Sequence, residues 1–141
     1  MKNFKQILFL SVLCLAAVSC HKKDNNNNTG TQCVAGAGGN VTIVCYAKHN
    51  GVTLLNYDVH PDTAFIKYGA TMLAGIGPSD CDTFFVGEAG EDHIHCKGLK
   101  CGIYYIYRTA YDSVANARYA GGISINITQT SGEIDTAINV N

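Results

Sequence analysis

The chain has 141 residues, of which 47% are hydrophobic, and it contains 15 glycines, seven cysteines and no tryptophan. Ten Lys and Arg residues against eleven Asp and Glu residues give a net charge of -1, which excludes the strongly basic profile of a nucleic-acid-binding protein. Glycine-punctuated sequence rich in tyrosine and β-branched residues favours strands over helices.

The N-terminal segment has the layout of an export signal. Lys2 and Lys5 precede an apolar run over residues 7–18, which is shorter than the roughly twenty residues that a membrane-spanning helix needs. Residues 16–20 read Ala-Ala-Val-Ser-Cys and resemble the lipobox of bacterial lipoproteins, although Ala17 stands at the usual leucine position. We therefore expect residues 1–19 to be removed and Cys20 to carry the lipid that anchors the protein to the membrane. The alternative is an ordinary cleaved signal with a chance cysteine.

Residues 20–36 read as a lipidated, flexible tether. Charged residues at 21–24 and four asparagines at 25–28 form a polar stretch that cannot bury enough apolar surface to fold. This stretch resembles the tethers of Bacteroidota lipoproteins. We expect a single folded domain over residues 37–141, held in the bacterial cell envelope as an outer-membrane lipoprotein.

Seven short strands are predicted along the folded domain, separated by turn signals such as His49-Asn50-Gly51 and Pro61-Asp62. Isoleucines that alternate with polar residues in the last two strands indicate that one sheet face is open to water. The regular spacing predicts an all-β, antiparallel β-sandwich. The predicted strands cover residues 41–46, 63–68, 83–86, 93–96, 103–107, 123–128 and 134–141.

Leu99, Gly102 and Tyr104 form an L-x-x-G-x-Y pattern that is typical of Greek-key corners, where the tyrosine hydroxyl bonds back to the chain. The surrounding segment resembles the signature of transthyretin-like, or prealbumin-like, domains, such as the regulatory-like domain of carboxypeptidases. The resemblance implies a Greek-key sandwich and a surface location rather than an activity. Hydroxyisourate hydrolases share this fold, but their C-terminal Tyr-Arg-Gly-Ser is missing here, since the chain ends Ala-Ile-Asn-Val-Asn.

Five cysteines follow Cys20, and an exported compartment permits disulfides. Cys96 and Cys101 flank the Leu99–Gly102 corner and are the first candidate pair, with Cys45 and Cys81 next and Cys33 left near the tether. The alternative for Cys45 and Cys96 is that they are small buried apolar residues.

His93 and His95 are two residues apart on a predicted strand, so both side chains point to the same face and could share one metal ion. Cys96 should point to the opposite face. A third ligand would have to come from residues that the sequence does not place, namely His49, His60, Glu91 or Asp92. The alternative is two exposed histidines on a solvated strand.

The sequence contains no G-x-S-x-G elbow, H-E-x-x-H motif or phosphate-binding loop, so we do not expect an enzyme. Arg108 and Asp112 are interpreted as turn and surface groups. Three Asp-Ser/Thr-apolar triplets resemble the O-glycosylation acceptor of Bacteroidota, with Thr63, Ser113 and Thr136 as the acceptors. Ordinary turn chemistry is the alternative for these triplets.

The sequence thus predicts a lipid-anchored, non-enzymatic envelope protein with a binding or structural β-sandwich and no required cofactor. We expect a carbohydrate or protein contact, and Tyr104, Tyr107, Tyr111 and Tyr119 are the tyrosines that could stack on a sugar ring. The competing hypothesis is a metal-handling lipoprotein that uses His93 and His95.

Overall fold

A computed structural model describes residues 33–72 and 78–141. Eight strands and one short 3-10 helix, Pro78–Asp80, make up this part of the chain. None of its helices has the length and apolar character needed to cross a membrane. The strands are β1 (Ala37–His49), β2 (Val52–Thr53), β3 (Thr63–Tyr68), β4 (Thr83–Val86), β5 (His93–Leu99), β6 (Gly102–Asp112), β7 (Ala117–Ile127) and β8 (Ser131–Asn139).

All seven predicted strands are present, and β3 and β4 have the predicted bounds. The sequence missed β2, which consists of two residues after the predicted Asn50-Gly51 turn. Both turn residues have positive φ, 51° and 82°, as a tight hairpin requires. The predicted signal sequence, Cys20 and residues 20–32 of the predicted tether lie outside the described residues.

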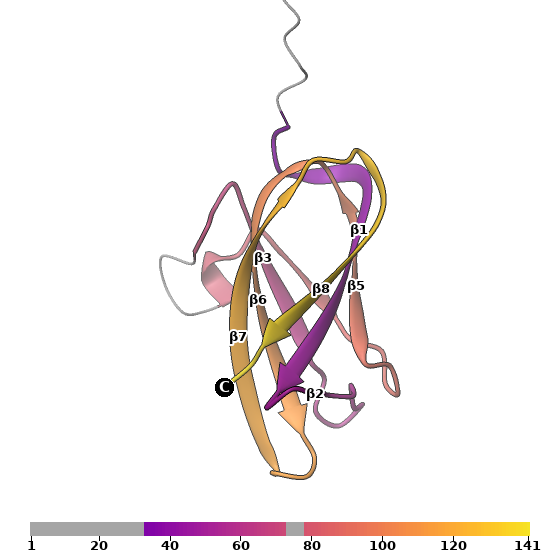
Figure 1. The fold of residues 1–141 in the computed structure, drawn as a ribbon, viewed down its shortest axis with the longest axis vertical. Coiled ribbons are helices and arrows are strands. Elements are labelled where there is room, and N and C mark those ends of the chain that lie inside the picture. The colour runs from indigo at the N-terminus through magenta and orange to yellow at the C-terminus, as the bar shows by residue number, and fades with distance from the viewer. Residues whose placement is uncertain (1–32, 73–77) are drawn as a thin grey trace, which may run out of the picture. The chain divides into compact units, whose positions relative to one another are not determined.

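The strands form two sheets that face each other in a sandwich (Figure 1). In one sheet β1 is central, with β5 and the short β2 antiparallel to it and β8 parallel to it. The other sheet has the order β4-β3-β6-β7, and all of its pairs are antiparallel. The predicted all-β sandwich is therefore confirmed. The prediction that it is antiparallel holds for every described pair except β1 with β8, which run parallel.

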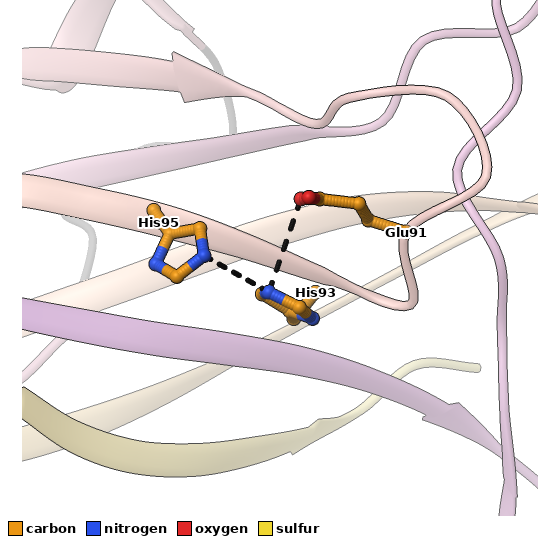
Figure 2. A group of neighbouring side chains, drawn as sticks. All are labelled: Glu91, His93 and His95. Carbon is orange, nitrogen blue, oxygen red and sulfur yellow. Dashed lines mark hydrogen bonds and ion pairs between the residues drawn. The ribbon is translucent and has the colours of Figure 1, made fainter.

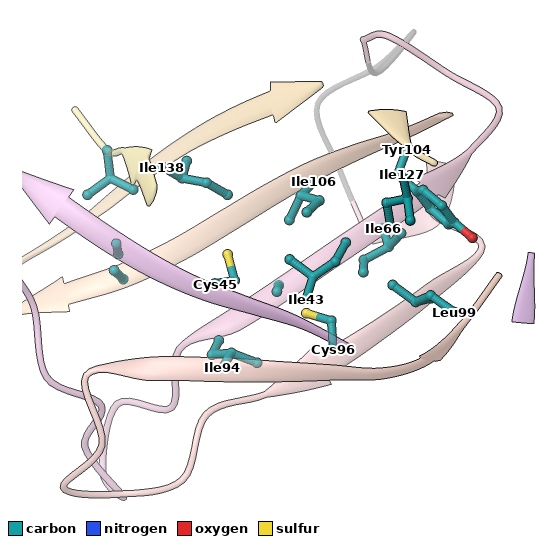
Figure 3. Close-up of a cluster of buried hydrophobic side chains, with 14 of the residues drawn as sticks. Ile43, Cys45, Ile66, Ile94, Cys96, Leu99, Tyr104, Ile106, Ile127 and Ile138 are labelled. Atoms are coloured by element: carbon teal, nitrogen blue, oxygen red, sulfur yellow. The ribbon is translucent and has the colours of Figure 1, made fainter. Parts of the chain in front are cut away.

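The core lies between the two sheets and follows the alternation of each strand. Isoleucines dominate it, and Figure 3 shows Ile43, Ile66, Ile94, Ile106, Ile127 and Ile138 pointing into the same space. Cys45 and Cys96 also face this space and are fully buried, on the neighbouring strands β1 and β5. The alternative that these two cysteines are core residues is confirmed.

The predicted corner between β5 and β6 is present. Tyr104 is fully buried, and its hydroxyl donates to the carbonyl oxygen of Lys100 at 2.7 Å, the bond expected of a tyrosine corner. The same hydroxyl accepts from the backbone N–H of Gly36 at 3.0 Å. Gly102 has φ +142, and a Cβ there would collide with Ala35, so the corner requires glycine at this position. The burial of Tyr104 removes it from the tyrosines that could stack on a sugar.

The disulfide joins Cys33 to Cys101, so the predicted Cys96–Cys101 and Cys45–Cys81 pairs are wrong. The reason is strand alternation, because Cys96 points into the core whereas Cys101 lies in the corner beyond Leu99. The segment at Gly36 runs along this corner, where its carbonyl oxygen accepts from Lys100 N–H at 2.9 Å, and it brings Cys33 to Cys101. Residues 33–36, which were predicted to belong to the tether, are therefore held against the sandwich by the disulfide and by this hydrogen bond.

Candidate metal centre

Glu91, His93 and His95 place one ligand atom each within 4.8 Å of one another (Figure 2). The two histidine Nε2 atoms are 3.0 Å apart, and Nε2 of His93 lies 3.8 Å from Oε2 of Glu91. All three side chains are partly exposed at the surface of the sandwich. One carboxylate and two imidazoles are the ligand set of several open zinc and iron sites in proteins.

Strand alternation brings the two histidines together. Ile94 and Cys96 point into the core, so His93 and His95 face outward, opposite Tyr46 and Val44 of β1. This shared outward face of His93 and His95 was predicted from the sequence, as was the opposite orientation of Cys96.

Asp92 orients the ring of His93. Its Oδ1 lies 2.7 Å from Nδ1 of His93, and a carboxylate can only accept there, so Nδ1 carries the ring proton. The lone pair of neutral His93 is then on Nε2, which faces His95 and Glu91. Carboxylate–histidine–metal arrangements of this kind fix the tautomer and raise the basicity of a metal ligand.

His95 has an unpartnered ring nitrogen. With the lone pair of His93 on Nε2, the 3.0 Å contact requires Nε2–H of His95 to donate. Nδ1 of His95 is buried and has no hydrogen-bond partner among the described residues. Metal binding through Nε2 would move the His95 proton to Nδ1, which lacks a partner in either tautomer. The change of tautomer therefore breaks no hydrogen bond of the His95 ring other than the one to His93.

A buried asparagine holds the loop that carries Glu91. Asn56 is 1% exposed; its backbone N–H donates to the carbonyl oxygen of Glu91 at 2.7 Å, and its own carbonyl oxygen accepts from Gly90 at 3.0 Å. Its side-chain amide donates to the carbonyl oxygen of His93 at 2.8 Å. A Cβ at Gly87 would overlap the Asn56 side chain, so glycine at 87 leaves room for it. Asn56 thus fixes the position of the backbone at both Glu91 and the start of β5.

Arg108 supports Asn56 from the core. Arg108 and Asp62 are both fully buried, with Nη2 of the guanidinium 3.6 Å from Oδ2 of Asp62 and 3.0 Å from Oδ1 of Asn56. The guanidinium also donates to the carbonyl oxygen of Cys45. The interpretation of Arg108 as a surface group is therefore wrong. Its position in β6 points inward by strand alternation, and the arginine can be buried there because Asp62 compensates its charge.

The surroundings of the cluster carry net negative charge. The outer face of β8, β1 and β5, called here the histidine face, holds four carboxylates (Glu91, Asp92, Glu133 and Asp135) against Lys48 and Lys97. Desolvation raises the pKa of Tyr46, and so do the carboxylates of three neighbours, Asp135, Asp92 and Glu133. A negative potential favours the approach of a cation. Next to His93, an open depression of about 380 Å³ is lined by Tyr46, Lys48, Thr53, Asp92 and residues 135–137.

The other predicted ligands lie elsewhere. His49 stacks on Tyr119 with ring centroids 3.8 Å apart, and His60 stacks on Tyr111 at 4.0 Å. Cys96 faces the core, where burial and the neighbouring Cys45 raise the pKa of its thiol. Burial raises the pKa of Cys45 to about 11. Neither thiol contributes to the cluster, because both side chains point into the core, opposite to the outward-facing histidines.

The geometry fits a small transition-metal ion. Metal–nitrogen bonds of about 2.0–2.1 Å in a tetrahedral site place two ligand nitrogens about 3.3 Å apart. The two Nε2 atoms are 3.0 Å apart, so the two rings would have to move only slightly apart to bind an ion. Three protein ligands leave at least one position for water or an exchangeable ligand. A site open on one side suits reversible loading more than a purely structural role.

The remaining predicted residues are spread over the sandwich. Ser113 lies in the exposed β6–β7 turn, Thr63 begins β3, and Thr136 is half-buried in β8. Their glycosylation stays a prediction. Tyr119 packs against the core, and Tyr111 lies between His60 and Tyr57. Sequence reasoning missed the supporting role of Asn56, because its partners are backbone groups far away along the chain.

Comparisons with protein-family models, curated proteins and solved structures find no match to this chain.

Proposed function

We propose that the protein is a lipid-anchored envelope lipoprotein whose β-sandwich binds a divalent transition-metal ion, of the zinc or copper class, through Glu91, His93 and His95. The observation that carries the proposal is the convergence of these three ligands within 4.8 Å, with Asp92 already orienting His93. The role is non-enzymatic metal handling, in which the open side of the site lets the ion be loaded and released.

The anchor is supported by the sequence alone. The charged N-terminus, the apolar run over residues 7–18 and the small residues before Cys20 favour lipidation and export to the outer membrane. Incorporation of radiolabelled palmitate into the full chain, and its loss in Cys20→Ala, is the expected result. Release of an unlabelled soluble domain from cells would overturn this part of the proposal.

We further propose that the sandwich is of the transthyretin-like, Greek-key type. The Tyr104 corner supports this type, and so does the passage of the chain between the two sheets at β2–β3, β4–β5, β5–β6 and β7–β8. An experimental structure that aligns with transthyretin-like domains strand by strand would support the assignment, and a different strand order in that alignment would contradict it.

Metal binding is tested on the full chain, produced without chelator and purified in a non-ionic detergent. Elemental analysis should find one zinc or copper ion per chain, and calorimetric titration with each metal should give a one-site isotherm. His93→Ala and His95→Ala should each weaken binding more than the roughly 10- to 100-fold expected from losing a supporting residue.

His49→Ala and His60→Ala are the matched controls, because each removes a partly or fully exposed histidine that lies outside the cluster. Both controls should bind metal as the unchanged protein does. Equal loss in the controls, or unchanged binding in the His93 and His95 variants, would show that the ion is held elsewhere.

A further inference from the structure

The outer face of the β4-β3-β6-β7 sheet carries a row of aromatic rings that the metal site does not use. Cross-strand pairing places Phe84 beside Phe65, Phe65 beside Tyr107, and Tyr107 beside Gly122. Ring centroids are 6.4 Å apart for Phe84 and Phe65, and 6.3 Å apart for Phe65 and Tyr107. The row therefore crosses three strands and ends at a glycine.

The row is open to solvent. Phe84 is 63% exposed and its neighbour Val86 is 50% exposed, whereas Phe65 and Tyr107 are partly exposed. A Cβ at Gly122 would meet the hydroxyl of Tyr105, so Tyr105 lies across the glycine instead of standing away from the sheet. Together with Ile103, which is 42% exposed, these residues form a broad and low surface, called here the aromatic face.

The charged residues of this face are either paired with an opposite charge or lie at its edge. Nζ of Lys67 pairs with Oδ1 of Asp82 at 3.1 Å. Arg118, at the start of β7, donates to the carbonyl oxygen of Pro61 at 3.2 Å. The other outward-facing polar residues on the described strands of this sheet have neutral side chains, and besides the tyrosines they are Thr63, Thr109, Ser124 and Asn126.

We infer that the aromatic face binds a neutral polysaccharide chain. Sugar rings present apolar C–H faces that stack on aromatic rings, and their equatorial hydroxyls need neutral hydrogen-bonding partners at the margins, which is the distribution found here. A face without uncompensated charge at its centre matches an uncharged ligand and gives no attraction to the phosphates of nucleic acids or lipid headgroups. The inference rests on the opposite sheet from the metal site and is independent of it.

The test is affinity electrophoresis of the full chain in a non-ionic detergent, in native gels that contain starch, mixed-linkage β-glucan, xylan or galactomannan. Retardation by at least one of these polysaccharides is the expected result. Phe84→Ala and Tyr107→Ala should each weaken that binding about tenfold, because each removes one stacking ring. Val114→Ala, at a residue 96% exposed in the β6–β7 turn, is the matched control and should leave retardation unchanged.

Three results would overturn the inference. The first is free migration in all four gels, and the second is retardation that survives both ring substitutions. The third is a dimer in sedimentation analysis that Phe84→Ala converts to a monomer, which would make the aromatic face an interface between two copies of the chain. Metal stoichiometry measured on the same samples shows whether the histidine face is intact in each variant.

Discussion

The two outer faces of the sandwich are built on similar strands yet carry different chemistry. On the histidine face, imidazoles and carboxylates converge on a point, and Asn56 and Arg108 hold that point from inside. On the aromatic face, the rings lie in a row across neighbouring strands, and Gly122 leaves room for Tyr105 to lie across it. A metal ion needs a few atoms in fixed positions, whereas a polymer needs extended contact. The buried polar network lies between the two sheets, and Asn56 connects it to the loop and strand of the first face.

The largest expected effect tests whether the buried Arg108 stabilises the sandwich that carries both faces. Arg108→Met leaves Asp62 buried without its cation, so the free energy of unfolding should fall by about 3–5 kcal/mol. Urea denaturation monitored by tyrosine fluorescence measures this change. Arg118→Met removes an exposed arginine and should change stability by less than about 0.5 kcal/mol. A loss below about 1 kcal/mol in Arg108→Met would mean that the buried Asp62 does not depend on the Arg108 cation.

The second prediction concerns the end of the sandwich away from the metal loop. The Cys33–Cys101 disulfide spans 68 residues, and replacing both cysteines by serine should lower the free energy of unfolding by about 4 kcal/mol. Metal affinity and polysaccharide retardation of the protein that remains folded should not change, since the disulfide lies at the β5–β6 corner, and neither the metal ligands nor the Phe84–Phe65–Tyr107 row belongs to that corner. A change in metal affinity would show that the histidine face depends on the whole fold.

A smaller effect separates the two faces directly. Asp92→Asn keeps the shape of the side chain but removes the carboxylate that orients His93, so metal affinity should fall about 10- to 100-fold. Polysaccharide retardation should be unaffected. Asp112→Asn, whose carboxylate caps the β6–β7 turn at Val114 and Ala115, is the control for loss of one negative charge. Equal weakening in both variants would point to long-range electrostatics instead of ligand orientation.

The smallest expected effect uses the core thiols as reporters. Cys45 and Cys96 are fully buried and their thiol pKa values are raised, so neither should react with a thiol reagent at pH 8 in the folded protein. In partly denaturing urea, metal at about ten times its Kd should slow their labelling about tenfold, because only the folded state binds it. Labelling that metal does not slow would mean that the ion also binds the unfolded chain.

Local pattern predicted much of this molecule. Alternation gave the strands, the shared face of His93 and His95, and the inward position of Cys96, while L-x-x-G-x-Y predicted the corner at Tyr104. Contacts between distant segments were not predictable in the same way. The pairing of Cys33 with Cys101 depends on how the entering chain runs along the corner.

Arg108 shows the second limit of sequence reasoning. Its strand position points inward, but an arginine is placed in a core only where a partner compensates its charge, and Asp62 is distant along the chain. The hydrogen bonds between Asn56 and the backbone of residues 90–93 could not be predicted from the sequence for the same reason.

The parallel pairing of β1 with β8 also affects when the protein can fold. β1 is the central strand of its sheet, and its partners at Asn40 and Lys48 are Ser131 and Asn139, near the opposite end of the chain. During synthesis, β1 emerges long before β8 and has one unsatisfied edge until β8 arrives. Contacts this distant in sequence slow folding. The topology thus delays completion of the histidine-bearing sheet until β8, the last of the described strands, has emerged.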